Sequence, residues 1–291
     1  MRFADIAEQL HRRTTTMADR ADGARRFVIG LGKKVLIGNT VGATADAVFA
    51  LSASRLNAPL AWLGLLCYTI QIYFDFSGYS DMAIGLARML GFRFPENFNY
   101  PYVAQSIADF WRRWHISLST WLRDYLFFPL GVRGGRAKLY RNTLIVFLLC
   151  GFWHGAAWHY VLWGLFHGAF LVLERTGLSR VLDLAPKPLR HAYALVVIML
   201  GWVLFRAASI PAAGAYFSAL AGLGGAGSTE PIVPYLPADV VLALAAGIVA
   251  SVPLRLPRWP IAEFACVAAV FLASLALTSA QTFKPFIYFR F

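Results

Sequence analysis

The longest uncharged stretch of the chain runs from residue 142 to residue 173, and it contains no Asp, Glu, Lys or Arg. As one helix, these 32 residues would extend about 48 Å, well beyond a hydrocarbon core of about 30 Å. We therefore expect this segment to be steeply tilted, or broken near Gly151 or Gly155.

The same alternation of long apolar and short polar stretches continues along the rest of the chain. A long helix is predicted over residues 59–90, and irregular loops are predicted over residues 91–102 and 222–237, where Pro, Asn or Gly accumulate. Further windows poor in charge cover residues 56–74, 191–205, 207–229, 240–254 and 264–283. The pattern predicts an all-α, polytopic membrane protein with about eight membrane-embedded helical segments, some tilted, re-entrant or interfacial, in one domain over residues 1–291.

Composition strengthens the membrane interpretation. Hydrophobic residues make up 58% of the chain and charged residues 14%, which leaves too little polar surface to cover a soluble globule of this size. The net charge of +12 does not indicate nucleic-acid binding, because the basic residues lie in short connectors beside apolar segments. Such connectors favour the cytoplasmic side and anionic lipid head groups, so the expected partner of this charge is the bilayer.

Three histidines, His154, His159 and His167, lie inside the uncharged segment. An imidazole at membrane depth is costly and usually faces a bundle interior or a water-filled cavity, so each is a candidate functional residue. On one continuous helix, His154 would lie about 140° from either of the others, which is poor geometry for shared metal ligands. We expect no metal site here unless the helix breaks. His159 and His167 are expected to be structural, through interhelical hydrogen bonds or interface positions.

The polar block over residues 109–131 holds another histidine. Projection as one helix places His115 on a largely apolar stripe with Trp111 and Leu122. One interpretation is an interfacial helix whose arginines reach the head groups and whose His115 bonds to backbone. The other places His115 in a polar core where it meets His154.

Other charged or catalytic patterns are weak. The chain has no G-x-S-x-G elbow and no Walker lysine, and Asp75 and Asp81 lie about 120° apart on a helix, which is poor geometry for a catalytic carboxylate pair. Asp81 and Arg88 are seven residues apart on one helix face, so we expect them to form a buried ion pair.

Three ordered blocks carry a family resemblance. They are QIYFDFSGYSDMAIGLARMLGFRFPENFNYPY at residues 71–102, DFWRRWHISLSTWLRDYLFFPLG at residues 109–131 and GFWHGAAWHYVLWGLFHG at residues 151–168. These blocks resemble the membrane-bound O-acyltransferases, specifically the branch of alginate and exopolysaccharide O-acetyltransferases.

The resemblance implies a multi-helix membrane enzyme with a tunnel through its core, moving an acyl group from a cytoplasmic donor to a hydroxyl acceptor. The catalytic histidine of the family's WHG motif corresponds to His154, and the histidine of the RRWHISLS motif corresponds to His115, placed near it. The residues expected to shape the channel or hold a donor phosphate are Trp111, Arg112, Arg113, Trp114 and Trp153.

The expected function is therefore O-acetylation of an alginate-like secreted polysaccharide by a multi-pass protein of the bacterial inner membrane. No bound cofactor is expected. Acetyl-coenzyme A is the expected donor, and an extracytoplasmic acetyltransferase is the expected protein partner. Family members usually carry several further helices before these blocks, so the chain resembles the carboxy-terminal portion of the family fold. The alternative is a truncated, non-catalytic scaffold that anchors the partners of acetylation. A proton-relay transporter would also use membrane histidines, but it explains neither the ordered blocks nor the lack of visible repeats.

Overall fold

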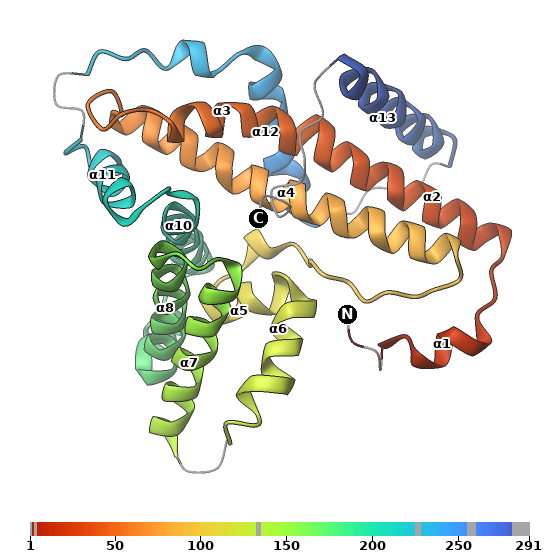
Figure 1. Ribbon diagram of the computed structural model, residues 1–291. Helices are drawn as coiled ribbons and strands as arrows, with labels where there is room; N and C mark the ends of the chain where they lie inside the picture. The colour runs from red at the N-terminus through yellow and green to blue at the C-terminus, as the bar shows by residue number, and fades with distance from the viewer. Residues whose placement is uncertain (1, 3–4, 132–134, 225–227, 255–259, 281–291) are drawn as a thin grey trace. The chain divides into compact units, whose positions relative to one another are not determined.

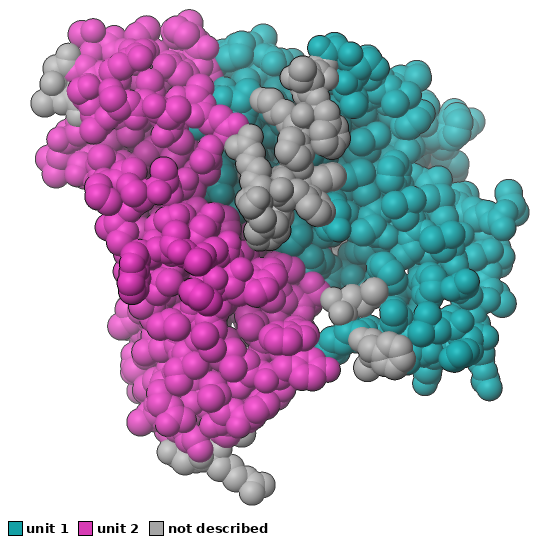
Figure 2. Space-filling model, in the orientation of Figure 1, with its two compact units in different colours: residues 1–45, 67–97, 236–291 teal, residues 46–66, 98–235 magenta. Residues whose placement is uncertain are grey.

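The computed structural model describes residues 2, 5–131, 135–224, 228–254 and 260–280, and over these ranges the chain is helical and contains no strand (Figure 1). The predicted all-α class is confirmed. The fold divides into two compact units (Figure 2). Unit 1 comprises residues 1–45, 67–97 and 236–291, and unit 2 comprises residues 46–66 and 98–235. The single domain over the whole chain stays a prediction.

Among the residues that the structure describes, three helices are long and apolar enough to cross a membrane: α4 (Ala58–Met89), α10 (Lys187–Arg206) and α13 (Pro260–Ala280). Two shorter apolar helices are α11 (Ile210–Leu220) and α12 (Ala238–Ala250). The long helix predicted over residues 59–90 is confirmed as α4, whereas the window at 207–229 contains only α11 as a helix among its described residues. Residues 225–227 and 281–283 of the predicted windows lie outside the described ranges. The count of about eight membrane segments stays a prediction.

Unit 1 is built around glycine contacts between two helices. It begins with α1 (Ala7–Arg12) and α2 (Met17–Gly32), which continues through the π-helical η2 (Lys33–Gly38) into α3 (Asn39–Phe49), whose residues up to Ala45 belong to unit 1. A Cβ added at Gly30 would lie 2.6 Å from the carbonyl oxygen of Gly78, and one added at Gly85 would lie 2.5 Å from that of Gly23. The seven-residue spacing of these glycines on both helices lets α2 and α4 run antiparallel in close contact (Figure 1).

Asp81 has different partners from the one predicted. It accepts hydrogen bonds from Arg26 at 2.8 Å and from Lys33 at 2.6 Å, both on the neighbouring α2–η2 helix. Arg88 instead pairs with Asp22 at 2.7 Å. The predicted Asp81–Arg88 pair is wrong because two turns of helix separate the residues by about 10 Å along the axis, while the packed helix brings cations directly opposite Asp81.

Unit 1 also contains a buried ion pair. Lys34 of η2 donates to Asp75 of α4, and their side chains are only 7% and 4% exposed. Burying either charge alone would cost several kcal/mol, so the pair fixes the register of η2 against α4.

Unit 2 contains the second and third of the blocks that carry the family resemblance, at residues 109–131 and 151–168, whereas most of the first block lies in unit 1. An irregular stretch follows α4 and leads to the short 3₁₀ helix η3 (Pro101–Val103). The next elements are α5 (Ile107–Arg113), α6 (Ile116–Leu122), the π-helical η4 (Arg123–Phe127) and the two helices α7 (Arg136–His154) and α8 (Trp158–Leu173). The unit continues with the π-helical η5 (Glu174–Leu178), α9 (Ser179–Leu184), α10, α11 and the 3₁₀ helix η6 (Val233–Tyr235). The predicted loop over residues 91–102 is confirmed, apart from the start of η3 at its end.

The uncharged segment is a hairpin of two helices. α7 ends at His154, Gly155 is extended with φ 168° and ψ 147°, and α8 begins at Trp158. The two helices lie side by side (Figure 1), and a Cβ added at Gly164 would come within 2.1 Å of the Phe147 carbonyl oxygen. The predicted break beside His154 is therefore confirmed, and the glycines on both helices allow the backbones to touch.

Candidate active site

The helix of the second block breaks at His115. Trp114 is extended, His115 has left-handed backbone angles (φ 44°, ψ 54°), and α6 begins at Ile116. The prediction of a single helix over residues 109–131 is therefore wrong. The sequence does not reveal this break, because no Gly or Pro lies at it. A left-handed non-glycine residue is strained and persists only where its surroundings hold it.

Trp114 provides that support. Its side chain is 2% exposed and packs against the rings of Phe98 and Trp202, each with its centroid 5.0 Å away. Trp114 thus belongs to the packed core of unit 2. Its predicted part in shaping a channel stays a prediction, whereas its contacts explain how the break before His115 is fixed.

His154 is the last residue of α7 and is only half-buried. The rings of Trp163 and Phe205 meet it edge to face, with centroids 5.1 Å and 5.2 Å away. Its neighbour Trp153 is 58% exposed. His115 and His154 are close enough to interact electrostatically. Two helix breaks, one at each histidine, therefore bring together the two residues that the sequence nominated as catalytic.

The other two histidines of the hairpin occupy interhelical positions. The ring nitrogen Nδ1 of His159 lies 3.2 Å from the carbonyl oxygen of Leu204 on α10. His167 is fully buried against Trp111 and Trp163, each with its centroid 5.3 Å away. These positions fit the structural roles expected for both. Within the described parts of the chain, no group of three or more His, Cys, Asp or Glu residues could hold a metal ion.

A buried carboxylate fixes the start of α5. Glu174 is 4% exposed and accepts hydrogen bonds from the backbone amides of Ile107 at 2.6 Å and Ala108 at 3.0 Å, and from the hydroxyl of Tyr193 at 3.2 Å. These are the unpaired amides of a helix N-terminus, where a negative charge is stabilising. Glu174 therefore ties η5 and α10 to the helix that leads to His115.

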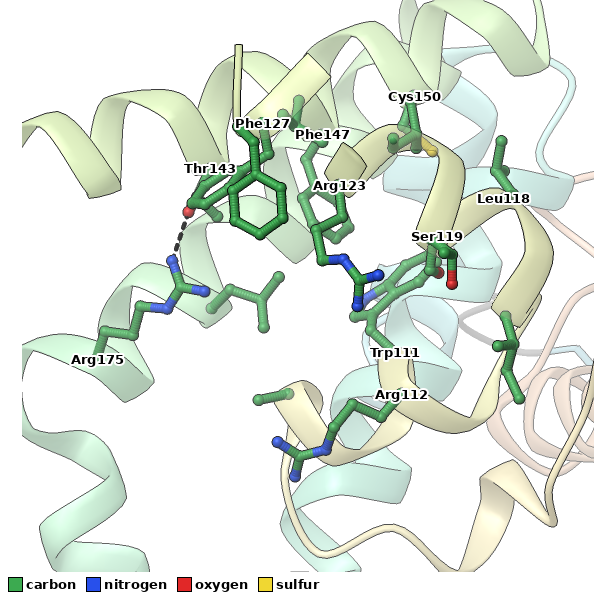
Figure 3. A pocket seen from close by; sticks show the side chains of 17 residues that line it. Trp111, Arg112, Leu118, Ser119, Arg123, Phe127, Thr143, Phe147, Cys150 and Arg175 are labelled. Atoms are coloured by element: carbon green, nitrogen blue, oxygen red, sulfur yellow. Dashed lines mark hydrogen bonds between the residues drawn. The ribbon is translucent and has the colours of Figure 1, made fainter. Parts of the chain in front are cut away.

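A cavity of about 420 Å³ opens beside this helix, between α5, α6, η4, α7, α8 and η5 (Figure 3). Trp111, Arg112, Arg123 and Arg175 line it, and so does Cys150, one helical turn before His154. Two of the predicted substrate-binding residues, Trp111 and Arg112, thus belong to the cavity.

Arg113 does not line the cavity. Its Nε donates to Asp109 at 3.0 Å and its Nη1 donates to the Asn99 carbonyl oxygen at 3.3 Å. The sequence reasoning missed Arg123, Arg175 and Glu174. In the sequence, Glu174 and Arg175 stand out only because they are the first charged residues after the uncharged segment.

Residues 25–211 match the membrane-bound O-acyltransferase family. The chain belongs to this family. It is 50% identical over 228 residues to a probable alginate O-acetylase of Azotobacter vinelandii, covering 77% of this chain and 45% of the relative. It is 39% identical over 346 aligned positions to a probable alginate O-acetylase of Pseudomonas fluorescens, covering 100% of this chain and 69% of that relative.

A peptidoglycan O-acetyltransferase of Helicobacter pylori is 44% identical over 205 residues, covering 68% of this chain and 38% of the relative. The chain spans about two fifths of the length of several of the curated relatives it matches. The match to the family includes α4 to α10 with both histidine-bearing breaks, so the candidate site lies inside the family region.

Proposed function

We propose that this protein is a membrane O-acyltransferase that moves an acetyl group from a cytoplasmic donor toward hydroxyl groups of a secreted, alginate-like polysaccharide. The donor is acetyl-coenzyme A. The protein resides in the bacterial inner membrane as a multi-pass protein, where an extracytoplasmic acetyltransferase is its partner. The relatives named for alginate and peptidoglycan O-acetylation support the polysaccharide acceptor.

The observation that supports the proposal is that His154 and His115 each lie at a helix break and are near enough to interact electrostatically. Both histidines are half-buried, so each side chain keeps some exposed surface that a substrate can reach.

The chemistry requires a base that is neutral near pH 7. A hydroxyl is a weak nucleophile, and an unperturbed imidazole, with a pKa of about 6.5, can accept its proton during attack on a carbonyl. In the proposed reaction His154 takes the hydroxyl proton as the oxygen attacks the thioester carbonyl. Collapse of the tetrahedral intermediate breaks the C–S bond, and the imidazolium returns the proton to the thiolate. The products are an ester and a free thiol. In a two-step variant, His154 carries the acyl group transiently.

The remaining candidates have supporting roles. His115 orients or polarises the partner group at His154, and its Nδ1 lies 3.4 Å from the hydroxyl of Ser117. Trp153 borders the site with an exposed ring, and Trp111 and Arg112 line the neighbouring cavity.

The test is His154→Ala in cells that express the protein with its operon, with acetate on the secreted polymer as the readout. We expect polymer acetylation to be lost while the amount of membrane-inserted protein is unchanged. His159→Gln is the matched control, because a glutamine amide can still donate to the Leu204 carbonyl oxygen. Acetylation that persists at the normal level in His154→Ala would refute the role of His154.

The alternative of a non-catalytic scaffold makes the opposite prediction in the same assay. A scaffold would bind its partners through its surface and would not use the imidazole of His154 in catalysis, so His154→Ala would leave acetylation unchanged. Labelled acetyl-coenzyme A supplied to membranes with the full operon would then show which polymer becomes labelled and which polypeptide it requires.

A further inference from the structure

Three arginines extend into the cavity of unit 2, and no carboxylate lines it. Arg112 comes from α5, Arg123 from η4 and Arg175 from η5, and their guanidinium groups extend toward the same open space (Figure 3). All three side chains are exposed, so solvent reduces their mutual repulsion, but together they give the cavity a positive potential. A positive potential of this kind favours an anionic ligand.

The partners of these arginines do not neutralise the cavity. Arg112 lies 3.6 Å from Asp109, and Arg123 donates to Asp124 at 2.8 Å, but neither carboxylate lines the space. Arg175 donates to the neutral hydroxyl of Thr143 at 2.7 Å. A guanidinium has five N–H donors, and these contacts use only some of them, so each fork can still bind an oxyanion.

The backbone that carries the arginines is specialised. Arg123 is the first residue of the π-helical η4, and Arg175 is the second residue of the π-helical η5. A π-helical turn such as η4 is rare and occurs frequently at functional sites, whereas η5 contains a kink at Gly177, whose φ is 151°. Glu174, adjacent to Arg175, is bonded to the first amides of α5, the helix that carries Arg112. Two of the three guanidinium groups are therefore positioned by a common hydrogen-bonded framework.

The walls of the cavity are apolar. Phe127, Val146, Phe147 and Leu171 form much of its surface, and the volume of about 420 Å³ falls within the range of small-molecule sites. Cationic groups beside apolar walls fit a molecule that joins a phosphate to an extended, less polar chain. A free inorganic anion would leave the apolar surface unused.

We propose that this cavity binds a phosphate group carried on an extended chain, and that Arg112, Arg123 and Arg175 hold the phosphate. Two sources share this chemistry: a soluble phosphate-bearing thioester donor and the head group of an anionic phospholipid. The donor case rests on the proposed function and assigns the site where the donor is held before transfer.

The test measures binding and needs no acetyl transfer. The full chain is purified into phosphatidylcholine nanodiscs and titrated with coenzyme A in one arm. In the other arm, nanodiscs contain increasing phosphatidylglycerol, and bound lipid is counted by native mass spectrometry. The double variant Arg112→Gln/Arg123→Gln removes two exposed cations from the cavity. Arg136→Gln/Arg180→Gln is the matched control, because it removes the same charge from two exposed arginines that do not line the cavity.

We expect the cavity variant to weaken binding of one probe by about tenfold or more, since charge-assisted bonds to two guanidinium groups are lost. The control should stay within about twofold of the unmodified protein. The arm that responds identifies the source of the phosphate. Equal weakening in both double variants, or no binding of either probe to the unmodified protein, would overturn the proposal.

Two further variants keep this result separate from the catalytic proposal. Arg112→Lys/Arg123→Lys retains the charge and should recover part of the affinity. His154→Ala should bind the probe as the unmodified protein does, because His154 does not line the cavity. If His154 proves unnecessary for acetylation, the binding result for the arginines is unaffected. If the arginine variants bind the probes normally, the test of His154 is likewise unaffected.

Discussion

Adding one methyl group at Gly164 should separate the hairpin that presents His154. In Gly164→Ala, the new Cβ would lie 2.1 Å from the carbonyl oxygen of Phe147 and 3.2 Å from the Cα of Gly151. Both atoms belong to the backbone of α7, so no side-chain rotation relieves the clash. Restoring an ordinary contact requires the helices to move apart by about 1 Å at their closest point.

The magnitude follows from two opposing terms. Overpacking of this kind costs about 1–3 kcal/mol, and a gap of about 1 Å along the hairpin forfeits up to about half of the dispersion energy of the atoms at the contact. Replacing glycine by alanine inside a helix returns about 0.5–1 kcal/mol. Because the obstacle is rigid backbone, we expect a net loss of about 2 kcal/mol.

Gly214→Ala is the matched control, since it makes the same chemical change at a helix position where an added Cβ meets nothing within 4 Å. It should raise stability by about 0.5–1 kcal/mol, so the two variants are expected to differ in sign. The assay is thermal unfolding in detergent micelles, followed by tryptophan fluorescence. A Gly164→Ala protein that melts like the unmodified one, or a Gly214→Ala protein that falls as far, would refute the backbone-contact reasoning.

Three other predictions concern buried charge and backbone strain. Glu174→Gln should lower stability by about 1.5–3 kcal/mol in the same melting assay, because an amide cannot replace a carboxylate that accepts from two backbone amides; unchanged melting would contradict the anchoring role. Lys34→Met should cost about 3–5 kcal/mol by leaving Asp75 buried without its cation, while the double variant Lys34→Met/Asp75→Leu should unfold close to the unmodified protein. A double variant no better than Lys34→Met alone would contradict that account. At His115, asparagine tolerates the left-handed backbone and should preserve stability, whereas valine should cost about 1–2 kcal/mol. Polymer acetylation should be lost in both, and activity in the asparagine variant would show that the ring is dispensable.

The parts of the fold that were predicted correctly depend on local information. The helix α4 follows from an unbroken apolar run, and the break at Gly155 follows from a segment too long for one crossing. The partners of Asp81 were not predictable in this way, because Arg26 lies 55 residues earlier and reaches Asp81 only through helix packing. The break at His115 was missed for a similar reason. It is held by the burial of Trp114 among distant rings, and no local breaker marks it.

The candidate site shows the same division. The sequence nominated His154 and His115 through their motifs, and a helical projection could not place them together, since it treated each block as one straight helix. The cavity was beyond sequence reasoning, because Arg112, Arg123 and Arg175 belong to three elements that meet only in the folded unit. Arg113 illustrates the reverse case. It shares the motif with Arg112, yet it bonds to Asp109 and Asn99 and does not line the cavity.

Glu174 gives a physical reason why the histidines and the arginine cavity occur in the same unit. Its carboxylate bonds the first amides of α5, and the last turn of α5 leads directly to the break at His115. The next residue, Arg175, extends into the cavity. A rigid start for α5 fixes both Arg112 and His115, because a helix of seven residues transmits its orientation along about 10 Å. We therefore expect a shift of η5 to move Arg175, the start of α5 and the break at His115 together, through one buried carboxylate.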